Sequence, residues 1–410
     1  MLYLRNTGND ANPGTLELPL ATPEEALRRF QLPDPLGRGH KVVECTGYTV
    51  SNTDPLRMDF PRAAHKYEFD FSRPGGADNG REDIWDIPIE FRADPILVTT
   101  VPVTGVTIDT ATGLATINVS SALVPNALVG NFVWKGLFEQ GVIESNTVNS
   151  ITVAGYTTDY SGTLKIYKQS CTIDRPISFS SEALLLFNGI KFGPEFHVFA
   201  DRWLLFSRCY FDDTDLGFFA EGRVFVVDCY QIGGYFRSDG AGYNVIGCVF
   251  DKVSFGWHGT GGSGVAAFEY CIATGCTPMG QGNHESATGI EITRMLIKNA
   301  QSYGIHRQSP YGSRTTKVRI ENAATGGVLI DCAGGFHKFS EVVGTNGGFG
   351  VTMKNGVQAL DQGNNSITGA SGDISLGGTT TTWATLAALA SGQSINDMAS
   401  AFPHFCRFMK

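Results

Sequence analysis

The sequence predicts an all-β protein, a right-handed parallel β-helix in which short strands stack coil upon coil. The main observation is a repeat in residues 169–378, where Cys209, Cys229, Cys248 and Cys271 recur at intervals of 20, 19 and 23 residues. A period of about 20–24 residues fits one coil of three short strands with turns between them. Composition agrees, because 50 of the 410 residues are Gly and long apolar helical stripes are few.

The repeat continues beyond the cysteines at Met295, Val318 and Phe339. Residues one period apart stack about 4.8 Å apart, so we expect these positions to form an interior ladder. We expect a second ladder to place glycines with positive φ at the corners of the coil: Gly217, Gly256, Gly280, Gly304 and Gly327. A leucine-rich repeat would need a Leu-x-x-Leu-x-Leu frame and an Asn ladder, which this sequence lacks.

Residues 1–40 are predicted to form an N-terminal cap of one strand, a turn and a short helix. Thr22 is the expected N-cap residue, Pro23 takes the first helical position, and Glu25 is expected to close a capping box. A solenoid needs such a lid, because its first coil would otherwise expose its core and its strand edges.

The rest of the chain divides into four segments. Residues 41–96 alternate short apolar runs with turns and are predicted to be the first coils. Residues 97–168 are rich in Thr and Val with clear alternation, which favours a small antiparallel barrel or sandwich inserted between coils. Residues 169–378 form the main β-helix, and 379–410 are expected to be a C-terminal cap or a contact with another subunit.

Charge and targeting signals limit the partners. The formal net charge is −9 and no basic stripe stands out, so we expect no nucleic-acid partner. No apolar run approaches the roughly 20 residues of a membrane helix, so no membrane insertion is expected. The start of the chain lacks the regions of a signal peptide, which favours synthesis in a cytoplasm. The nine cysteines include no CxxC pair and are expected to be buried free thiols.

The segment from Gly8 to Gly14, followed by the run Thr22-Pro23-Glu24-Glu25, resembles the opening of β-helix proteins in the pectate-lyase-like superfamily. That opening is commonest in bacteriophage tail spikes and fibres, and similar β modules recur in such proteins as insertions. The resemblance implies a virion protein, typically a homotrimer that contacts other virion proteins and recognises bacterial surface polysaccharide through the lateral face of its β-helix. Tail spikes usually carry a particle-binding domain before the β-helix. Here the opening motif begins by residue 6, which leaves a non-enzymatic head fibre or decoration subunit as an alternative.

No catalytic motif of known spacing is present: there is no phosphate loop, HExxH or GxSxG, and we expect no cofactor and no metal. Counting ten or eleven residues from each ladder position leads to a row of aromatic and titratable candidate residues along one side of the β-helix. Sugar-binding surfaces combine aromatic faces with fixed polar groups. The candidate glycan- or partner-binding residues in and beside this row are Phe219, Trp257, His258, His306, Arg307 and Tyr311.

A polysaccharide depolymerase, either hydrolase or lyase, is the enzymatic alternative. Glycoside cleavage usually needs two carboxylates about 5–9 Å apart, and neighbouring coils are about 5 Å apart. Asp213 or Asp215 facing Asp239 is therefore the candidate catalytic pair. The fold by itself does not decide between binding and cleavage, since function lies in the site.

Overall fold

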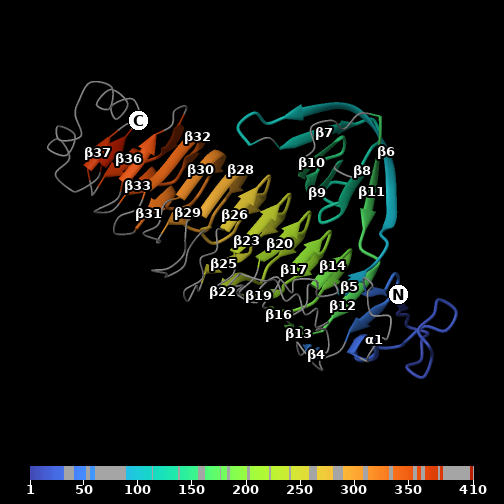
Figure 1. Ribbon diagram of the computed structural model, residues 1–410. Helices are drawn as coiled ribbons and strands as arrows, with labels where there is room; N and C mark the ends of the chain where they lie inside the picture. Colours follow the sequence, from blue (N-terminus) through green and yellow to red (C-terminus); the bar gives the residue numbers. More distant parts are fainter. Residues whose placement is uncertain are drawn as a thin grey trace, which may run out of the picture.

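The computed structural model confirms the predicted fold class. The chain forms a right-handed parallel β-helix, with its termini at opposite ends and a small antiparallel β-barrel against its side (Figure 1). The residues that the structure describes are 1–31, 41–51, 56–60, 89–112, 114–136, 139–155, 162–175, 177–181, 185–200, 204–220, 223–239, 242–257, 266–279, 290–307, 313–331, 336–353, 358–361, 365–376, 379–381 and 407–409.

Strands of successive coils pair in parallel and build three faces. Face A begins with β1 (Leu2–Tyr3) and ends with β38 (Arg407–Met409). Between them lie β2 (Lys41–Glu44), β5 (Ile89–Arg92), β14 (Leu185–Asn188), β17 (Leu204–Ser207), β20 (Arg223–Val227), β23 (Gly242–Ile246), β26 (Ala266–Glu269), the first parts of β28 (Ile290–Lys298), β30 (Ser313–Glu321) and β32 (Phe336–Asn346), and β34 (Gln358–Asp361).

Face B follows the first corner of each coil. It consists of β3 (Thr49–Ser51), β12 (Cys171–Asp174), β15 (Ile190–Phe192), β18 (Tyr210–Asp212), β21 (Tyr230–Ile232), β24 (Val249–Asp251), β27 (Ile272–Thr274), the second parts of β28, β30 and β32, and β35 (Ser366–Gly369).

Face C closes the coil in two sheets. The first holds β4 (Leu56–Phe60), β13 (Ile177–Ser181), β16 (Glu195–Ala200), β19 (Asp215–Ala220), β22 (Tyr235–Asp239) and β25 (Ser254–Trp257). The second holds β29 (Tyr303–Arg307), β31 (Gly326–Ile330), β33 (Phe349–Met353), β36 (Gly372–Leu376) and β37 (Thr379–Thr381), which folds back antiparallel.

The interior contains the predicted ladder. The thiols of Cys209, Cys229, Cys248 and Cys271 are free and buried, as expected for small apolar side chains. The register carries this ladder on through Met295 and Val318 to Val342, so the prediction of Phe339 at this position is wrong. Phe339 instead pairs with Thr315 on face A.

Single residues in the left-handed conformation make the corner between faces A and B. Arg208, Asp228 and Tyr270 have φ values of 54, 51 and 54° and each precedes a ladder cysteine. The corner residue keeps its place in the ladder, since Arg208 N–H donates to Val227 O at 3.1 Å. The chain therefore turns without losing the hydrogen bonds between coils.

The prediction that a glycine ladder forms the corners is wrong. Gly256, Gly304 and Gly327 lie inside strands β25, β29 and β31, and none of them has a positive φ. A Cβ on Gly327 would lie 2.5 Å from the carbonyl oxygen of Gly350. In this position glycine allows close approach of the next coil. The corners between faces A and B accept residues with side chains as well as other glycines, namely Gly189 and Gly247.

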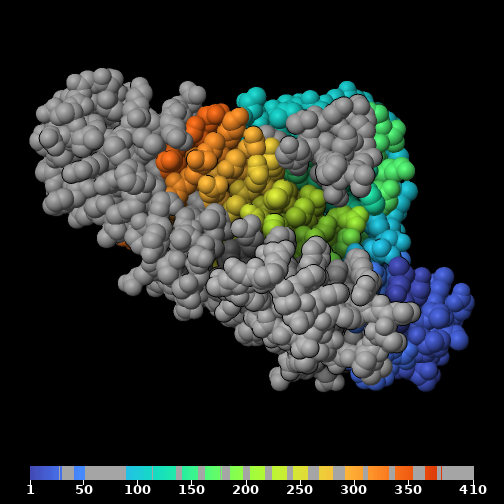
Figure 2. Space-filling model, viewed as in Figure 1, coloured from blue at the N-terminus to red at the C-terminus, as the bar shows by residue number. Residues whose placement is uncertain are grey.

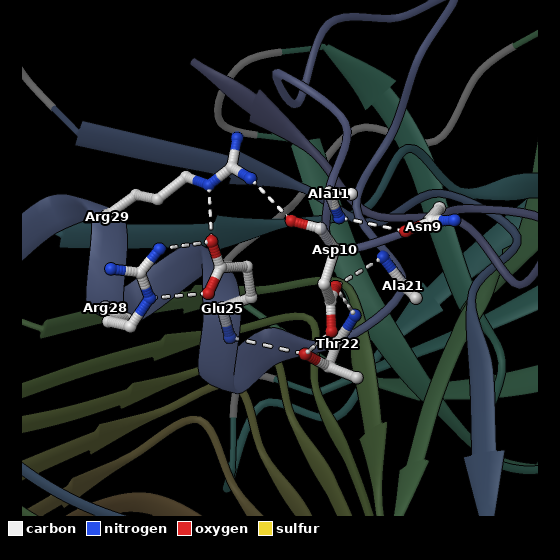
Figure 3. Close-up of polar contacts among 8 residues, drawn as sticks. All are labelled: Asn9, Asp10, Ala11, Ala21, Thr22, Glu25, Arg28 and Arg29. Atoms are coloured by element: carbon white, nitrogen blue, oxygen red, sulfur yellow. Dashed lines mark hydrogen bonds and ion pairs between the residues drawn. The ribbon is translucent and has the colours of Figure 1, made fainter.

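The N-terminal cap lies at the first coils, with the helix α1 (Pro23–Gln31) at the N-terminal end of the β-helix (Figure 1). Thr22 is the N-cap, because its hydroxyl accepts a hydrogen bond from Glu25 N–H at 3.3 Å. The predicted capping box is wrong, because Asp10 accepts the hydrogen bond from Thr22 N–H at 2.9 Å (Figure 3). The Glu25 carboxylate pairs with Arg28 and Arg29 instead, and these contacts lower its pKa to about 2.

The inserted module is a closed barrel in the order β10–β7–β6–β11–β8–β9. Its strands are β6 (Ile96–Ile108), β7 (Ala115–Val119), β8 (Phe132–Gly136), β9 (Glu139–Asn146), β10 (Ser150–Ala154) and β11 (Thr163–Lys168). All its pairings are antiparallel, as the alternation of apolar residues predicts. The helix-like run predicted near residues 383–390 lies outside the described residues.

Candidate functional site

The row of candidate residues predicted from the sequence lies on face C. The register stacks Phe219 directly on Asp239, and Ser238 on Trp257, so these three candidates share one end of neighbouring strands. His306 stacks on Leu329 in the second sheet of the same face, as counted from the sequence. The outward orientation of Phe219, Asp239 and Trp257 stays a prediction, and His258 and Tyr311 lie outside the described residues.

The structure does not bring the candidate catalytic carboxylates together. Asp215 pairs with Tyr235, so Asp239 lies four residues further along its strand, about 13 Å at 3.3 Å per residue. This separation is between backbone positions, and the side chain of Asp239 lies outside the described residues. Asp213 is an exposed corner residue with a φ of 50°, and its N–H donates to Ile232 O at 2.8 Å. The strand register thus sets Asp215 opposite Tyr235 and not opposite Asp239, and the catalytic role of Asp213, Asp215 and Asp239 stays a prediction.

His306 and Arg307 have different surroundings although they are neighbours in β29. His306 is half-buried, and its Nε2 lies 3.9 Å from Asp331 Oδ2. Arg307 is 2% exposed and donates to Thr315 Oγ1 at 3.5 Å. Arg307 therefore lies inside the coil, and the prediction that it contacts a ligand on the outer surface is wrong.

Face B is covered by the barrel. Leu114, Val142 and Ala154 of the barrel form one buried apolar cluster with Tyr230, Val249 and Ile272 of face B. Two ion pairs extend the contact along the axis: Lys298 with Glu144 at 2.7 Å, and Arg319 with Asp109 at 3.1 Å. An elongated ligand on these coils must therefore use face A or face C.

Face A presents a row of outward side chains that sequence reasoning missed. We call the lateral row the half-buried residues Leu186, Leu205, Phe225, Asn244 and Ala267, which stack in register on five successive coils. The row continues into Glu291 and Arg314, which are exposed. Figure 2 shows the surface of these coils, coloured green to orange, beside the barrel.

A signal for the lateral row was present in the repeat. Each of its members, from Leu186 to Ala267, lies four residues before the first residue of the interior ladder in its coil, as Leu205 does before Cys209. Because strand residues alternate between two faces and the corner residue has a left-handed conformation, this offset points outward. The six steps from Leu186 to Arg314 span about 29 Å at 4.8 Å per coil.

The corner beside the lateral row holds the most perturbed described carboxyl group. Asp228 is 7% exposed, and burial raises its pKa to about 7. The neighbouring Cys229 also raises this pKa, whereas Arg208 lowers it. The Arg208 guanidinium donates through Nε and Nη2 to Asn188 Oδ1, at 3.1 and 2.7 Å. The titratable Asp228 carboxyl and the Arg208 guanidinium, whose orientation is fixed by Asn188, thus both lie at the junction of the barrel and face A.

Two possible features are absent from the described part of the chain. Its His, Cys, Asp and Glu side chains form no group of three or more that could hold a metal ion. None of its helices has the length and apolar character needed to cross a membrane.

Comparison with known proteins yields weak structural similarities. No protein-family model and no curated protein matches the sequence. A solved glycoside hydrolase shares 11% identity over 92% of this chain and 95% of its own, with a TM-score of 0.31. The tailspike gp49 of Pseudomonas phage LKA1 shares 13% identity over 68% and 69% of the two chains, with a TM-score of 0.20. The tailspike gp61 of Pseudomonas phage phi297 shares 12% over 79% and 69%, with a TM-score of 0.22. At these scores the similarities assign neither a family nor a function.

Proposed function

We propose that this chain is a phage virion spike or fibre protein that recognises its host by binding bacterial surface polysaccharide along face A. The lateral row is the observation that carries the proposal. A repeating polymer fits a repeating surface, because each coil offers one outward side chain about 4.8 Å from the next. The resemblance of the opening segment, Gly8 to Gly14, to phage β-helix proteins supports the virion context.

The chemistry of the row suits a sugar chain. Phe225 supplies an aromatic face and Asn244 an amide that both donates and accepts hydrogen bonds. The strands beneath are fixed by parallel pairing on both sides, so the side chains are ordered before the ligand arrives. A preorganised surface loses less entropy on binding, which favours affinity for a flexible polymer.

The proposal is tested with purified capsule and lipopolysaccharide from candidate hosts, by measuring equilibrium binding to the immobilised polymer. We expect one polysaccharide to bind, and Phe225→Ser to weaken this binding at least about tenfold. Leu18→Ser is the matched control, because Leu18 is an exposed apolar residue in the N-terminal cap and should leave binding unchanged. Equal affinities of the two variants, at unchanged melting temperature, would remove face A from the proposal.

Cleavage is read from the same incubation, as new reducing ends or unsaturated sugars. Glu90 and Glu291 on the line of the lateral row are six coils apart, about 29 Å, which is too far for a catalytic pair. Glu269 lies nearer to Glu291, two positions along the neighbouring strand, but it forms an ion pair with Arg294 at 2.8 Å. We therefore expect binding without release of oligosaccharides. Release would establish the depolymerase alternative and direct attention to face C.

The homotrimer and the contacts with other virion proteins stay predictions. Since the barrel covers face B between Tyr230 and Ile272, subunits of a trimer must meet through other surfaces. Light scattering after size-exclusion chromatography measures the mass of the assembly, and we expect three copies. A monomer at working concentration would favour a decoration subunit that is held by its neighbours on the particle.

A further inference from the structure

We propose that the outer surface of the barrel beside Arg208 is a binding site for acidic sugars, that is, glycan units carrying a carboxylate. The inference rests on the proposed function, since the site adjoins the lateral row through the coil that holds Leu205 and Arg208. It adds the chemical class of the ligand and a second element, the barrel, to the binding surface.

The site is built on three adjacent strands, β8, β11 and β6. Val133, Leu164 and Ile166 point into the barrel core, so the residues that alternate with them point outward. The register sets Tyr167 between Phe132 and Leu97 in one row.

A second row lies beside the first on the same three strands. In it, Lys165 stands between Trp134 and Thr100. We call these six residues the barrel platform: Phe132, Tyr167, Leu97, Trp134, Lys165 and Thr100.

The barrel platform offers aromatic surface that is buried at one side and open at the other. Ring centroids are 6.0 Å apart for Phe132 and Tyr167, and 5.8 Å apart for Trp134 and Tyr167. Phe132 is 1% exposed whereas Leu97 is 50% exposed, with half-buried Tyr167 between them. Such a graded apolar shelf accommodates the apolar face of a sugar ring without a deep pocket.

Two cations flank the shelf. The Arg208 guanidinium lies 4.9 Å from the Trp134 ring centroid and is fixed in place by Asn188 Oδ1. Lys165 is exposed on the central strand, and no carboxylate of the described residues pairs with it. The carboxylates that act on Arg208 are Asp228 and Asp94, beside the thiols of Cys209 and Cys229.

The positive charges at the barrel platform favour sugars that carry a carboxylate over neutral sugars. A neutral sugar would use the aromatic shelf alone, whereas a carboxylated sugar also pairs with Lys165 at the open side. Because Lys165 is exposed, this contribution should weaken with salt. The geometry therefore points to uronate- or sialate-type units in the polysaccharide.

The test uses defined oligosaccharides and isothermal titration calorimetry of the full chain. The acidic probes are hexamers of mannuronate, galacturonate and sialic acid, and mannohexaose is the uncharged counterpart of the first. We expect at least one acidic hexamer to bind about tenfold more tightly than mannohexaose, and to lose affinity as salt rises from about 0.05 to about 0.3 M.

Two charge-reversal variants localise the effect. Lys165→Glu should weaken acidic binding about tenfold and leave mannohexaose unchanged. Lys252→Glu is the matched control, because Lys252 is an exposed lysine at a corner of the β-helix away from the barrel platform. Tyr167→Ser should weaken acidic and neutral hexamers alike, since it removes the shelf and not the charge.

Three results would overturn the inference. They are acidic hexamers that bind no more tightly than mannohexaose, acidic binding that Lys165→Glu leaves intact, and equal effects of Lys165→Glu and Lys252→Glu. Failure of the proposed function would be recognised by a different result, namely that no host polysaccharide binds the unmodified chain.

Discussion

The raised pKa of the buried Asp228 carboxyl leads us to predict that the free energy of unfolding falls as the pH rises. Its pKa is about 7 in the folded chain, against an ordinary value of 3.8, because the carboxyl group is buried at the corner beside the barrel. A carboxyl whose pKa is raised on folding contributes stability below its unfolded pKa, and this contribution is lost as pH rises through the folded pKa. A difference of about three pKa units corresponds to about 4 kcal/mol.

The perturbation is Asp228→Asn, which removes the charge and keeps a residue type that accepts the left-handed φ of 51°. We expect the variant to be up to about 4 kcal/mol more stable than the natural chain at pH 8, and close to it at pH 4. Urea unfolding followed by tryptophan fluorescence, repeated from pH 4 to pH 8, measures both free energies. Asp251→Asn, at a position half-open to solvent on face B, is the control.

The reasoning fails if Asp228→Asn and the natural chain lose stability in parallel between pH 4 and pH 8. Parallel curves would mean that the Asp228 carboxyl titrates near its ordinary pKa, so that water or Arg208 compensates its burial. A variant that is less stable at every pH would mean that the carboxylate holds the corner through hydrogen bonds.

Two further predictions test the packing of the coils. Phe206→Ala should lower the free energy of unfolding by about 3–5 kcal/mol, because Phe206 is fully buried and its ring stacks on Phe187 with 5.3 Å between centroids. Urea unfolding measures this loss, and a loss below about 1 kcal/mol would contradict the packed phenylalanine core. Gly344→Ala should cost more than about 2 kcal/mol, because Gly344 has a φ of 135° and a Cβ there would overlap the Ile320 carbonyl group. Gly47→Ala is its control, since Gly47 has a φ of 74° but nothing within 4 Å, and equal melting temperatures for the two variants would refute the steric argument.

The repeat made the interior of the β-helix predictable from the sequence. Cysteines at regular spacing identified the ladder, because every coil must fill the same interior position with an apolar side chain of similar size. The corners were not predictable in the same way. The predicted glycines are not there; the left-handed φ is carried by Gly247 in one coil and by residues such as Arg208 and Tyr270 in others, and the N–H groups of all three remain in the ladder between coils.

The surfaces were harder to predict than the core. Asp215 and Asp239 were expected to face each other, yet they occupy positions four residues apart on neighbouring strands. The spacing of 20 residues from Cys209 to Cys229 sets Asp215 opposite Tyr235, so that expectation departed from the repeat itself. The docking of the barrel depends on contacts such as Arg319 with Asp109, which are 210 residues apart. No local sequence pattern predicts such a contact. The covering of face B by the barrel and the burial of Asp228 at its corner therefore become visible only in the folded structure.

A crystal structure of the chain with oligosaccharides prepared from the polysaccharide it binds tests the central claim most directly. We predict density for sugar units along the lateral row, in contact with Phe225 and Asn244 and reaching the barrel near Arg208. Sugar bound only on face C, or between subunits away from both elements, would contradict the account.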